Sequence, residues 1–273
     1  MRMARWIGLA LAATAVLVLG AAAYVWFSGG SGEPSTEVTA PPITSPATTV
    51  PATTAPATTV PATTATTSVP VVTTAAPATT EATEPAETEG ASAVLYRIDK
   101  AESSVSFEID EILNGNPFRV VGVTTEVAGE VLIDFDNPAA SQLGAIVINV
   151  RTLATDSGFR DRAIRGPILG SSRDENEFAT FKPTDLEGLP DSVTMGDEVP
   201  LRITGTFSLS GESRPVTFDT AVTVVSAERV EVSGTATVLR SDFGLTIPDV
   251  PSVSDVAEEI LLVIDLVAVA EGA

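Results

Sequence analysis

The chain has 273 residues, a formal net charge of −21 at pH 7, and neither cysteine nor histidine. The missing residues exclude disulfides, thiolate nucleophiles, a Ser-His-Asp triad and imidazole metal sites. The acidity argues against nucleic acid or an anionic membrane surface as a partner, because both would repel the chain. The sequence also has no glycine-rich phosphate loop and no metal-ligand cluster, so we expect no nucleic-acid ligand and no cofactor.

The N-terminus predicts a membrane anchor. Residues 1–5 carry Arg2 and Arg5, and residues 6–27 then run without a charge. A helix of this length, at ~1.5 Å per residue, spans roughly 33 Å, which is enough for a bilayer core. The arginines before it and the aromatic residues at both ends predict a transmembrane signal-anchor with a cytoplasmic N-terminus. The alternative is a signal peptide cleaved near residues 21–23.

Both alternatives export the rest of the chain. With an intact anchor, the protein is a single-pass protein of the cell membrane, and its C-terminal domain is extracytoplasmic. With a cleaved leader, the domain is released in the same compartment.

A stalk follows the anchor. Residues 28–92 are rich in Thr, Pro, Ala and Val, and the unit Pro-Ala-Thr-Thr-Val/Ala repeats from residue 46 to residue 65. Proline removes backbone donors and the segment lacks the large apolar residues of a core, so we expect an extended, disordered stalk. Threonine beside proline is typical of an O-glycosylated stalk, and an unmodified linker fits the composition as well.

Residues 93–273 predict an all-β domain, a sandwich or a barrel, because short alternating runs are separated by turn residues. Asn114-Gly115 is a strong hairpin dipeptide. A short helix is expected over residues 159–165, ending at Gly166-Pro167. The expected strands cover residues 104–109, 126–135, 144–151, 180–186, 199–209, 215–225, 229–240 and 258–270.

Two polar motifs have both a structural and a functional interpretation. Residues 134–137 begin like a calcium loop but lack its glycine and glutamate, so a strand end with a turn is favoured. The basic run at residues 160–165 has the guanidinium groups to grip an anion. Ion pairs with the many acids of the domain are favoured instead, and we expect Arg160 and Asp161 to pin the helix to the sheet.

Six motifs follow one another along the domain. They are Tyr96-x-Ile98-Asp99 with Ser104-Val105-x-Phe107-x-Ile109, Val127-x-Gly129-x-Val131-x-x-Asp134, Thr155-Asp156-x-x-x-Arg160-Asp161, Phe178-x-x-Phe181, Gly205-x-Phe207-x-Leu209-x-Gly211-x-x-Arg214-Pro215-Val216, and Arg240-Ser241-Asp242-Phe243-Gly244. In this order they resemble the YceI-like family of bacterial lipid- or polyisoprenoid-binding proteins. The resemblance covers nearly all of residues 94–269.

The resemblance implies an antiparallel, eight-stranded, lipocalin-like barrel whose apolar cavity holds an isoprenoid chain or another amphiphile. It also implies binding rather than catalysis. The chain has Glu102, Glu111 and Ala163 at positions where histidine is common in the family. Head-group recognition through those histidines is therefore not expected here.

Strand alternation selects the residues expected to hold the ligand tail, and the polar head is expected near the mouth of the barrel. The expected lipid-binding residues are Phe107, Ile109, Val131, Ile133, Phe207, Leu209, Phe218, Leu262 and Ile264. Two alternatives stay open at this point. One is a module that binds a protein or the cell wall through a domain with a filled core; the other is an envelope enzyme that uses carboxylates such as Asp242 or Asp161.

Overall fold

The computed structural model describes residues 32–43 and 93–271, which belong to one compact unit. The predicted anchor at residues 6–27 and most of the predicted stalk lie outside these ranges. Among the described residues, no helix has the length and apolar character needed to cross a membrane.

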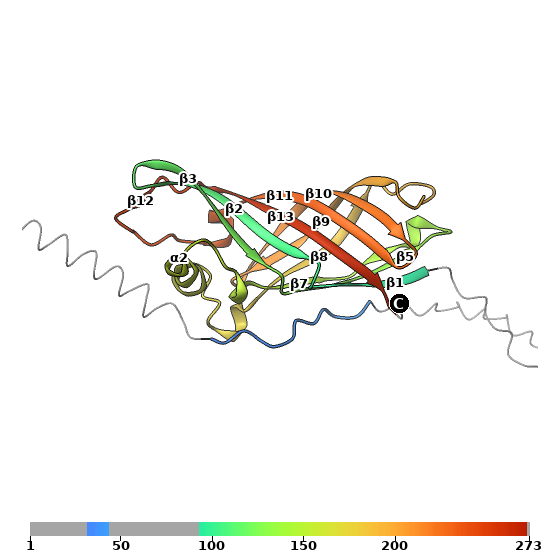
Figure 1. Ribbon diagram of the computed structural model, residues 1–273, viewed down its shortest axis with the longest axis horizontal. Coiled ribbons are helices and arrows are strands. Elements are labelled where there is room, and N and C mark those ends of the chain that lie inside the picture. The colour runs from blue at the N-terminus through green and yellow to red at the C-terminus, as the bar shows by residue number, and fades with distance from the viewer. Residues whose placement is uncertain (1–31, 44–92, 272–273) are drawn as a thin grey trace, which may run out of the picture. The chain divides into compact units, whose positions relative to one another are not determined.

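The domain is one strongly curled, mostly antiparallel sheet with a short helix at one end (Figure 1). Its longer strands are β1 (Ala93–Ile98), β2 (Ser104–Leu113), β3 (Asn116–Thr124), β5 (Glu130–Asp134), β7 (Ile146–Asn149), β8 (Phe178–Glu187), β9 (Glu198–Leu209), β10 (Glu212–Ser226), β11 (Arg229–Leu239) and β13 (Glu259–Ala270). The two-residue strands are β4 (Val127–Ala128), β6 (Gln142–Leu143) and β12 (Val253–Ser254).

In residues 32–43 and 93–271, helical structure is confined to short segments. The helix α2 (Gly158–Ala163) continues into a π-helical turn, η3 (Ile164–Ile168). The four 3-10 turns are η1 (Pro138–Ala140), η2 (Val150–Thr152), η4 (Asp174–Asn176) and η5 (Arg240–Phe243). The short helix expected over residues 159–165 is confirmed, but it does not end at Gly166-Pro167: the chain stays helical through Ile168, with Pro167 inside the π-helical turn.

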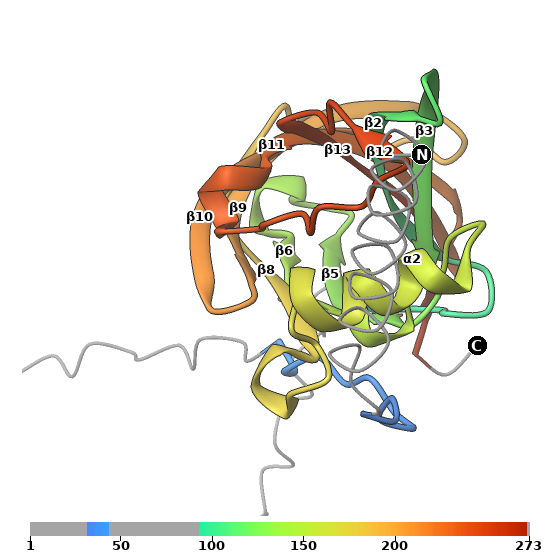
Figure 2. The same ribbon diagram turned by 90° about the vertical axis from the view of Figure 1, so that its left-hand side faces the viewer.

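The strand order is β4-β7-β8-β9-β10-β11-β13-β1-β5-β6, and β2 pairs with β3, β12 and β13. Only Gly129 separates β4, at one end of the strand path, from β5, which is next to the other end, so the chain connects the two sides of the curled sheet at this point. Figure 2, which looks along the long axis, shows the resulting curl.

The antiparallel all-β prediction is confirmed, whereas the expected count of eight strands is not. The described part of the chain forms a 13-stranded, half-barrel-like sheet. The difference has local causes: a break at Gly129 splits the expected strand at residues 126–135, and β1 and β3 had no assigned strand in the prediction.

Two tight turns set the register of long hairpins. The turn predicted at Asn114-Gly115 is confirmed, with φ values of 52° and 79°. It pairs Leu113 with Asn116. Ser210 and Gly211 form a second turn of this kind between β9 and β10. Turns with positive φ at both central residues match the right-handed twist of the strands they join.

Two apolar clusters fill the curled sheet. The larger one contains two edge-to-face ring pairs, Phe181 with Phe218 at 5.2 Å and Phe207 with Phe243 at 5.5 Å between ring centroids. The smaller one surrounds Tyr96 at the other end, where the hydroxyl donates to the carbonyl of Ala227 at 2.9 Å.

Residues 32–43 lie extended along the domain and are called the docked segment below; in Figure 1 they are drawn in blue. The side chain of Arg151 is 4% exposed and donates to the carbonyl of Glu33 at 2.7 Å. Glu177 accepts from the backbone nitrogen of Ser35 at 2.6 Å and from its hydroxyl at 3.0 Å. Ile43 donates from its nitrogen to Glu130 at 3.0 Å.

The docked segment corrects part of the stalk prediction. Its composition predicted disorder, but buried side chains of the domain bind three of its backbone groups, those of Glu33, Ser35 and Ile43. Burial alone would raise the pKa of Glu177, yet the hydrogen bonds from Ser35 and Asn149 and the charge of Arg151 together lower it below its ordinary value.

The packing of Phe218 generates a stability prediction. Phe218 is 7% exposed and contacts the Phe181 ring. Replacing it with alanine leaves a cavity, so Phe218→Ala is expected to lower the free energy of unfolding by about 3–5 kcal/mol, measured by urea denaturation. Val225 is 44% exposed. Val225→Ala serves as the control and is expected to change stability by less than about 0.5 kcal/mol.

The lowered pKa of Glu177 generates a pH prediction. A carboxylate with a lowered pKa in the folded state adds stability above its unfolded pKa of about 4.3, and this stability is lost as the pH falls through the folded value. Ser35→Pro removes both hydrogen bonds from Ser35. Its destabilisation relative to the parent chain, measured by urea denaturation, should be largest at pH 6 and should shrink toward pH 3. A pH-independent difference would contradict the coupling to Glu177, and Ser35→Ala, which keeps the N–H, should fall between the two chains.

Candidate functional site

A cavity of about 220 Å³ lies inside the curled sheet at the end that carries α2. Its walls come from β2, β9 and β13, its floor from the Phe207 and Phe243 rings, and its cover from α2, η3 and the loop at residues 245–256. Figure 2 looks onto this end of the molecule, and α2 and that loop both lie toward the viewer.

The lining is almost entirely apolar. Strand residues alternate so that every second side chain faces inward, which places Phe107 and Ile109 of β2 and Ile260 and Leu262 of β13 on the cavity. From the helical side, Ile164, Ile168 and Leu169 complete the wall. Such a surface offers dispersion contacts along its length and few hydrogen bonds, which suits a hydrocarbon ligand.

Charged groups gather at the rim, and each has a partner. Arg160 of α2 pairs with Glu111 of β2 at 3.1 Å, and its guanidinium lies 5.4 Å from the centre of the Phe118 ring. The Arg160 and Glu111 side chains are only 17% and 7% exposed. Arg240, which also lines the cavity, pairs with Glu258 at 2.9 Å. The rim therefore offers polar groups to a ligand head while the interior stays apolar.

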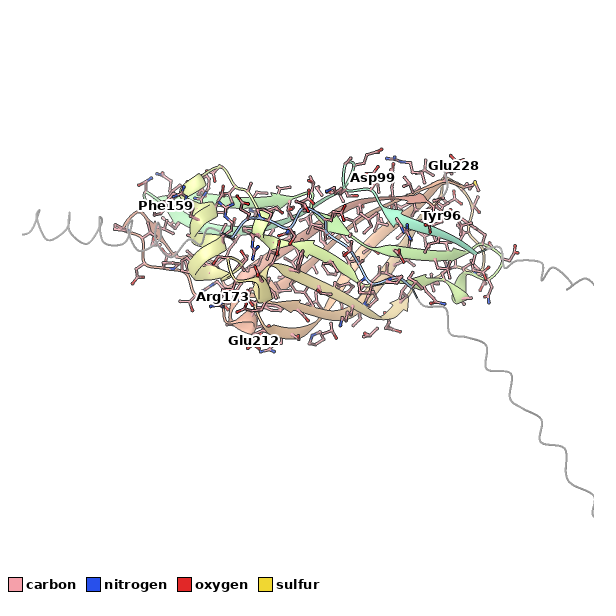
Figure 3. All side chains as sticks on the ribbon, turned by 90° about the horizontal axis from the view of Figure 1, so that it is seen from below. Tyr96, Asp99, Phe159, Arg173, Glu212 and Glu228 are labelled. Atoms are coloured by element: carbon pink, nitrogen blue, oxygen red, sulfur yellow. The ribbon has the colours of Figure 1, made fainter. Side chains whose placement is uncertain are left out.

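Phe159 marks the opening. It is the second residue of α2, lines the cavity and is 39% exposed (Figure 3). Arg160, which follows it, also holds Asp156 in an ion pair one helical turn earlier. Asp161 accepts from the backbone nitrogen and hydroxyl of Thr155 at 2.8 and 2.7 Å. The expected ion-pair role of Arg160 is confirmed, and Asp161 fixes the turn that enters the helix.

The structure brings together five of the residues expected to hold a ligand. Phe107, Ile109, Phe207, Leu209 and Leu262 line the cavity. Phe218 and Ile264 pack into the larger cluster without lining it. Val131 and Ile133 lie instead in the smaller cluster around Tyr96.

The main omission of the sequence analysis is the cover of the cavity. Ala163, Ile164 and Leu169 line it, as do the loop residues Ile247 and Val250. Strand alternation cannot find residues of a helix or an irregular loop. One signal was present: the loop at residues 245–256 carries apolar residues throughout, whereas a solvent-exposed loop is usually polar.

The carboxylates named for an enzymatic alternative do not meet. Asp161 is engaged by Thr155, while Asp242 lies exposed in η5. Neither lines the cavity. Among the described residues, no three acids gather as metal ligands would. The geometry therefore gives no acid/base pair at the cavity.

Comparisons with known proteins agree with this architecture. The family model described as a YceI-like domain matches residues 96–268. A polyisoprenoid binding domain from Saccharophagus degradans, implicated in plant cell wall breakdown, has a similar structure, with a TM-score of 0.51, 15% identity, and coverage of 65% of this chain and 99% of that one. Burkholderia cenocepacia BcnA gives a TM-score of 0.47 at 19% identity, covering 62% and 98% of the two chains. Among curated proteins, none matches this chain.

The largely buried Arg160–Glu111 pair at the rim generates a prediction. In a double-mutant cycle with Glu111→Gln and Arg160→Met, the coupling free energy measured by urea denaturation is expected at about 0.5–3 kcal/mol, because both groups are withdrawn from water. The control is the Arg202–Asp219 pair, whose side chains are 62% and 72% exposed. Its coupling should stay below about 1 kcal/mol. Equal coupling in the two pairs would show that burial does not strengthen the rim interaction.

Proposed function

Because the chain belongs to the YceI-like family, we propose that it is a membrane-tethered, extracytoplasmic binding protein that holds an apolar or amphiphilic lipid, of the isoprenoid class, in the cavity beneath α2. Residues 6–27 are its anchor, and the protein sits in the cell membrane as a single-pass protein. It binds its ligand and does not turn it over.

The observation that carries the proposal is the combination of an apolar interior with a charged rim. An amphiphile has the same two parts, a hydrocarbon tail and a polar head. The tail replaces water against Phe107, Leu209 and Leu262, at roughly 25 cal/mol per Å² of apolar surface buried. The head remains beside the Arg160–Glu111 and Arg240–Glu258 pairs.

The volume of the cavity favours a slender ligand over a bulky one. A volume of about 220 Å³ is smaller than the range of about 300–1,000 Å³ usual for drug-sized ligands. It suits one linear or methyl-branched chain better than a fused ring system. The similar fold of a domain that is named for binding polyisoprenoid supports the branched chain.

The proposal is tested by native mass spectrometry of the full chain, which reports a retained lipid as a mass increment that can be released and identified. A panel of isoprenoids and straight-chain fatty acids is then offered to the emptied protein. Retention of an isoprenoid supports the proposal. If the chain retains no lipid and binds nothing in the panel, the proposed function is wrong and the alternative of an interaction module with a filled core takes its place.

A matched pair of substitutions in β13 tests whether the retained lipid lies in the cavity. Ile260 lines the cavity, and its neighbour Leu261 does not. Ile260→Trp fills the space that the tail needs, so retained lipid is expected to fall by on the order of tenfold. Leu261→Trp should keep the retention of the parent chain. Circular dichroism and urea denaturation establish that both variants fold, and equal lipid retention by the two would place the ligand elsewhere.

A further inference from the structure

The two ends of the docked segment lie at different distances from the cavity, and its first residue is the nearer one. At its first residue, Gly32, an added β-carbon would lie 2.7 Å from the carbonyl oxygen of Ser172, so only glycine fits this close approach. Arg151, which holds Glu33, stands between two cavity-lining residues, Val150 and Leu153. Residue 32 therefore lies at the cavity end of the domain.

The other end of the docked segment lies far along the sheet. Ile43 bonds to Glu130, and Glu130 also accepts from Arg97 of β1 at 2.9 Å. This region adjoins the smaller cluster around Tyr96. Figure 1 shows the segment running from the loop before β8 toward β1, and Figure 3 shows Phe159 and Tyr96 at opposite ends of the domain. The chain thus enters the domain at the cavity end.

The length of chain before residue 32 limits how far this end can be from the anchor. The predicted span ends at residue 27, and an extended chain covers at most about 17 Å between residues 27 and 32. Without docking, residues 28–92 would act as a flexible spacer with a root-mean-square length of about 45 Å. Docking therefore changes both the distance and the orientation of the domain.

We infer that the docked segment holds the open end of the cavity against the surface of the membrane in which residues 6–27 insert, so that a lipid passes from the bilayer into the cavity without crossing water. The inference rests on the proposed function and on the predicted anchor. Its partner is a lipid surface without net negative charge, because an anionic surface would repel the acidic domain. Its structural basis is the set of contacts made by Gly32, Glu33, Ser35 and Ile43.

The contacts at the cavity end are specific enough to resist replacement by solvent. Arg151 and Glu177 are 3% exposed, and together they bind the carbonyl of Glu33 and both donors of Ser35. Hydrogen bonds to charged partners are about twice as strong as neutral ones. An extended, proline-containing peptide also loses little conformational entropy when it binds. The docked state is therefore the expected ground state.

The test measures the orientation of the full chain in liposomes. The sequence contains no cysteine, so a single introduced cysteine gives a unique labelling site. Asp249→Cys places a donor fluorophore in the loop over the cavity, and Glu228→Cys places it beside Ala227 at the opposite end. With acceptor dyes on the lipid head groups, energy transfer from position 249 is expected to exceed transfer from position 228.

Two changes in the docked segment remove its hold on the domain. Gly32→Val introduces a clash with the Ser172 carbonyl, and Ser35→Pro removes both donors to Glu177. Together they should equalise energy transfer from the two labels. Thr39→Val, at an exposed position, is the matched control and should leave the difference unchanged. Equal transfer in the parent chain, or a difference that survives the double change, would overturn the inference.

Lipid retention, measured on the same samples, separates this inference from the proposed function. If the double variant retains lipid at equilibrium but takes up lipid from its own bilayer on the order of tenfold more slowly than the parent chain, the proposed function and the membrane-facing role are both supported. If the parent chain is oriented but never retains lipid, the proposed function fails. If lipid is retained and loads equally fast without orientation, only the membrane-facing role fails.

Discussion

The buried guanidinium of Arg151 ties together separate parts of the chain at the cavity end of the domain. A charge withdrawn from water requires nearly complete compensation. Here it comes from Glu177, the carbonyl of Ser171, and the carbonyl of Glu33 in the docked segment. These partners come from two separate parts of the chain, residues 171–177 and the docked segment. One side chain therefore fixes their mutual position. Val150 and Leu153 flank Arg151 in the sequence and line the cavity, so the same contacts also position this part of the cavity wall.

The curl of the sheet depends on another kind of contact, in which an aromatic ring packs over a glycine of a neighbouring strand. The ring of Phe107 lies over Gly122, and the ring of Phe181 lies over Gly205, at distances that leave no room for a β-carbon. Glycine lets the sheet bend sharply at these points, and the ring replaces the missing side chain. Bending leaves an enclosed space. Phe181 packs into the larger apolar cluster of this space, and the cavity remains at the end that carries α2.

Sequence alternation predicted which face of each strand points inward, but not how far along the axis a residue lies. Of the residues selected by alternation, Phe107, Phe207 and Leu262 line the cavity, whereas Val131 and Ile133 pack into the smaller cluster at the other end. Alternation has a period of two residues and no marker of axial position. The helical residues that cover the cavity could not be predicted for a related reason. Their apolar residues do not follow the two-residue period of a strand, and only tertiary packing shows what they face.

The docked segment shows why composition is an incomplete guide to order. A proline-rich stretch cannot build a core, but it needs no core if a folded neighbour supplies partners for its backbone groups. Ser35 and Ile43 find such partners in Glu177 and Glu130. Proline makes this binding easier, because the unbound chain is already extended and loses less entropy on docking. The property that predicts disorder in isolation thus favours order beside the domain, and one low-complexity region can combine a bound part with a free spacer.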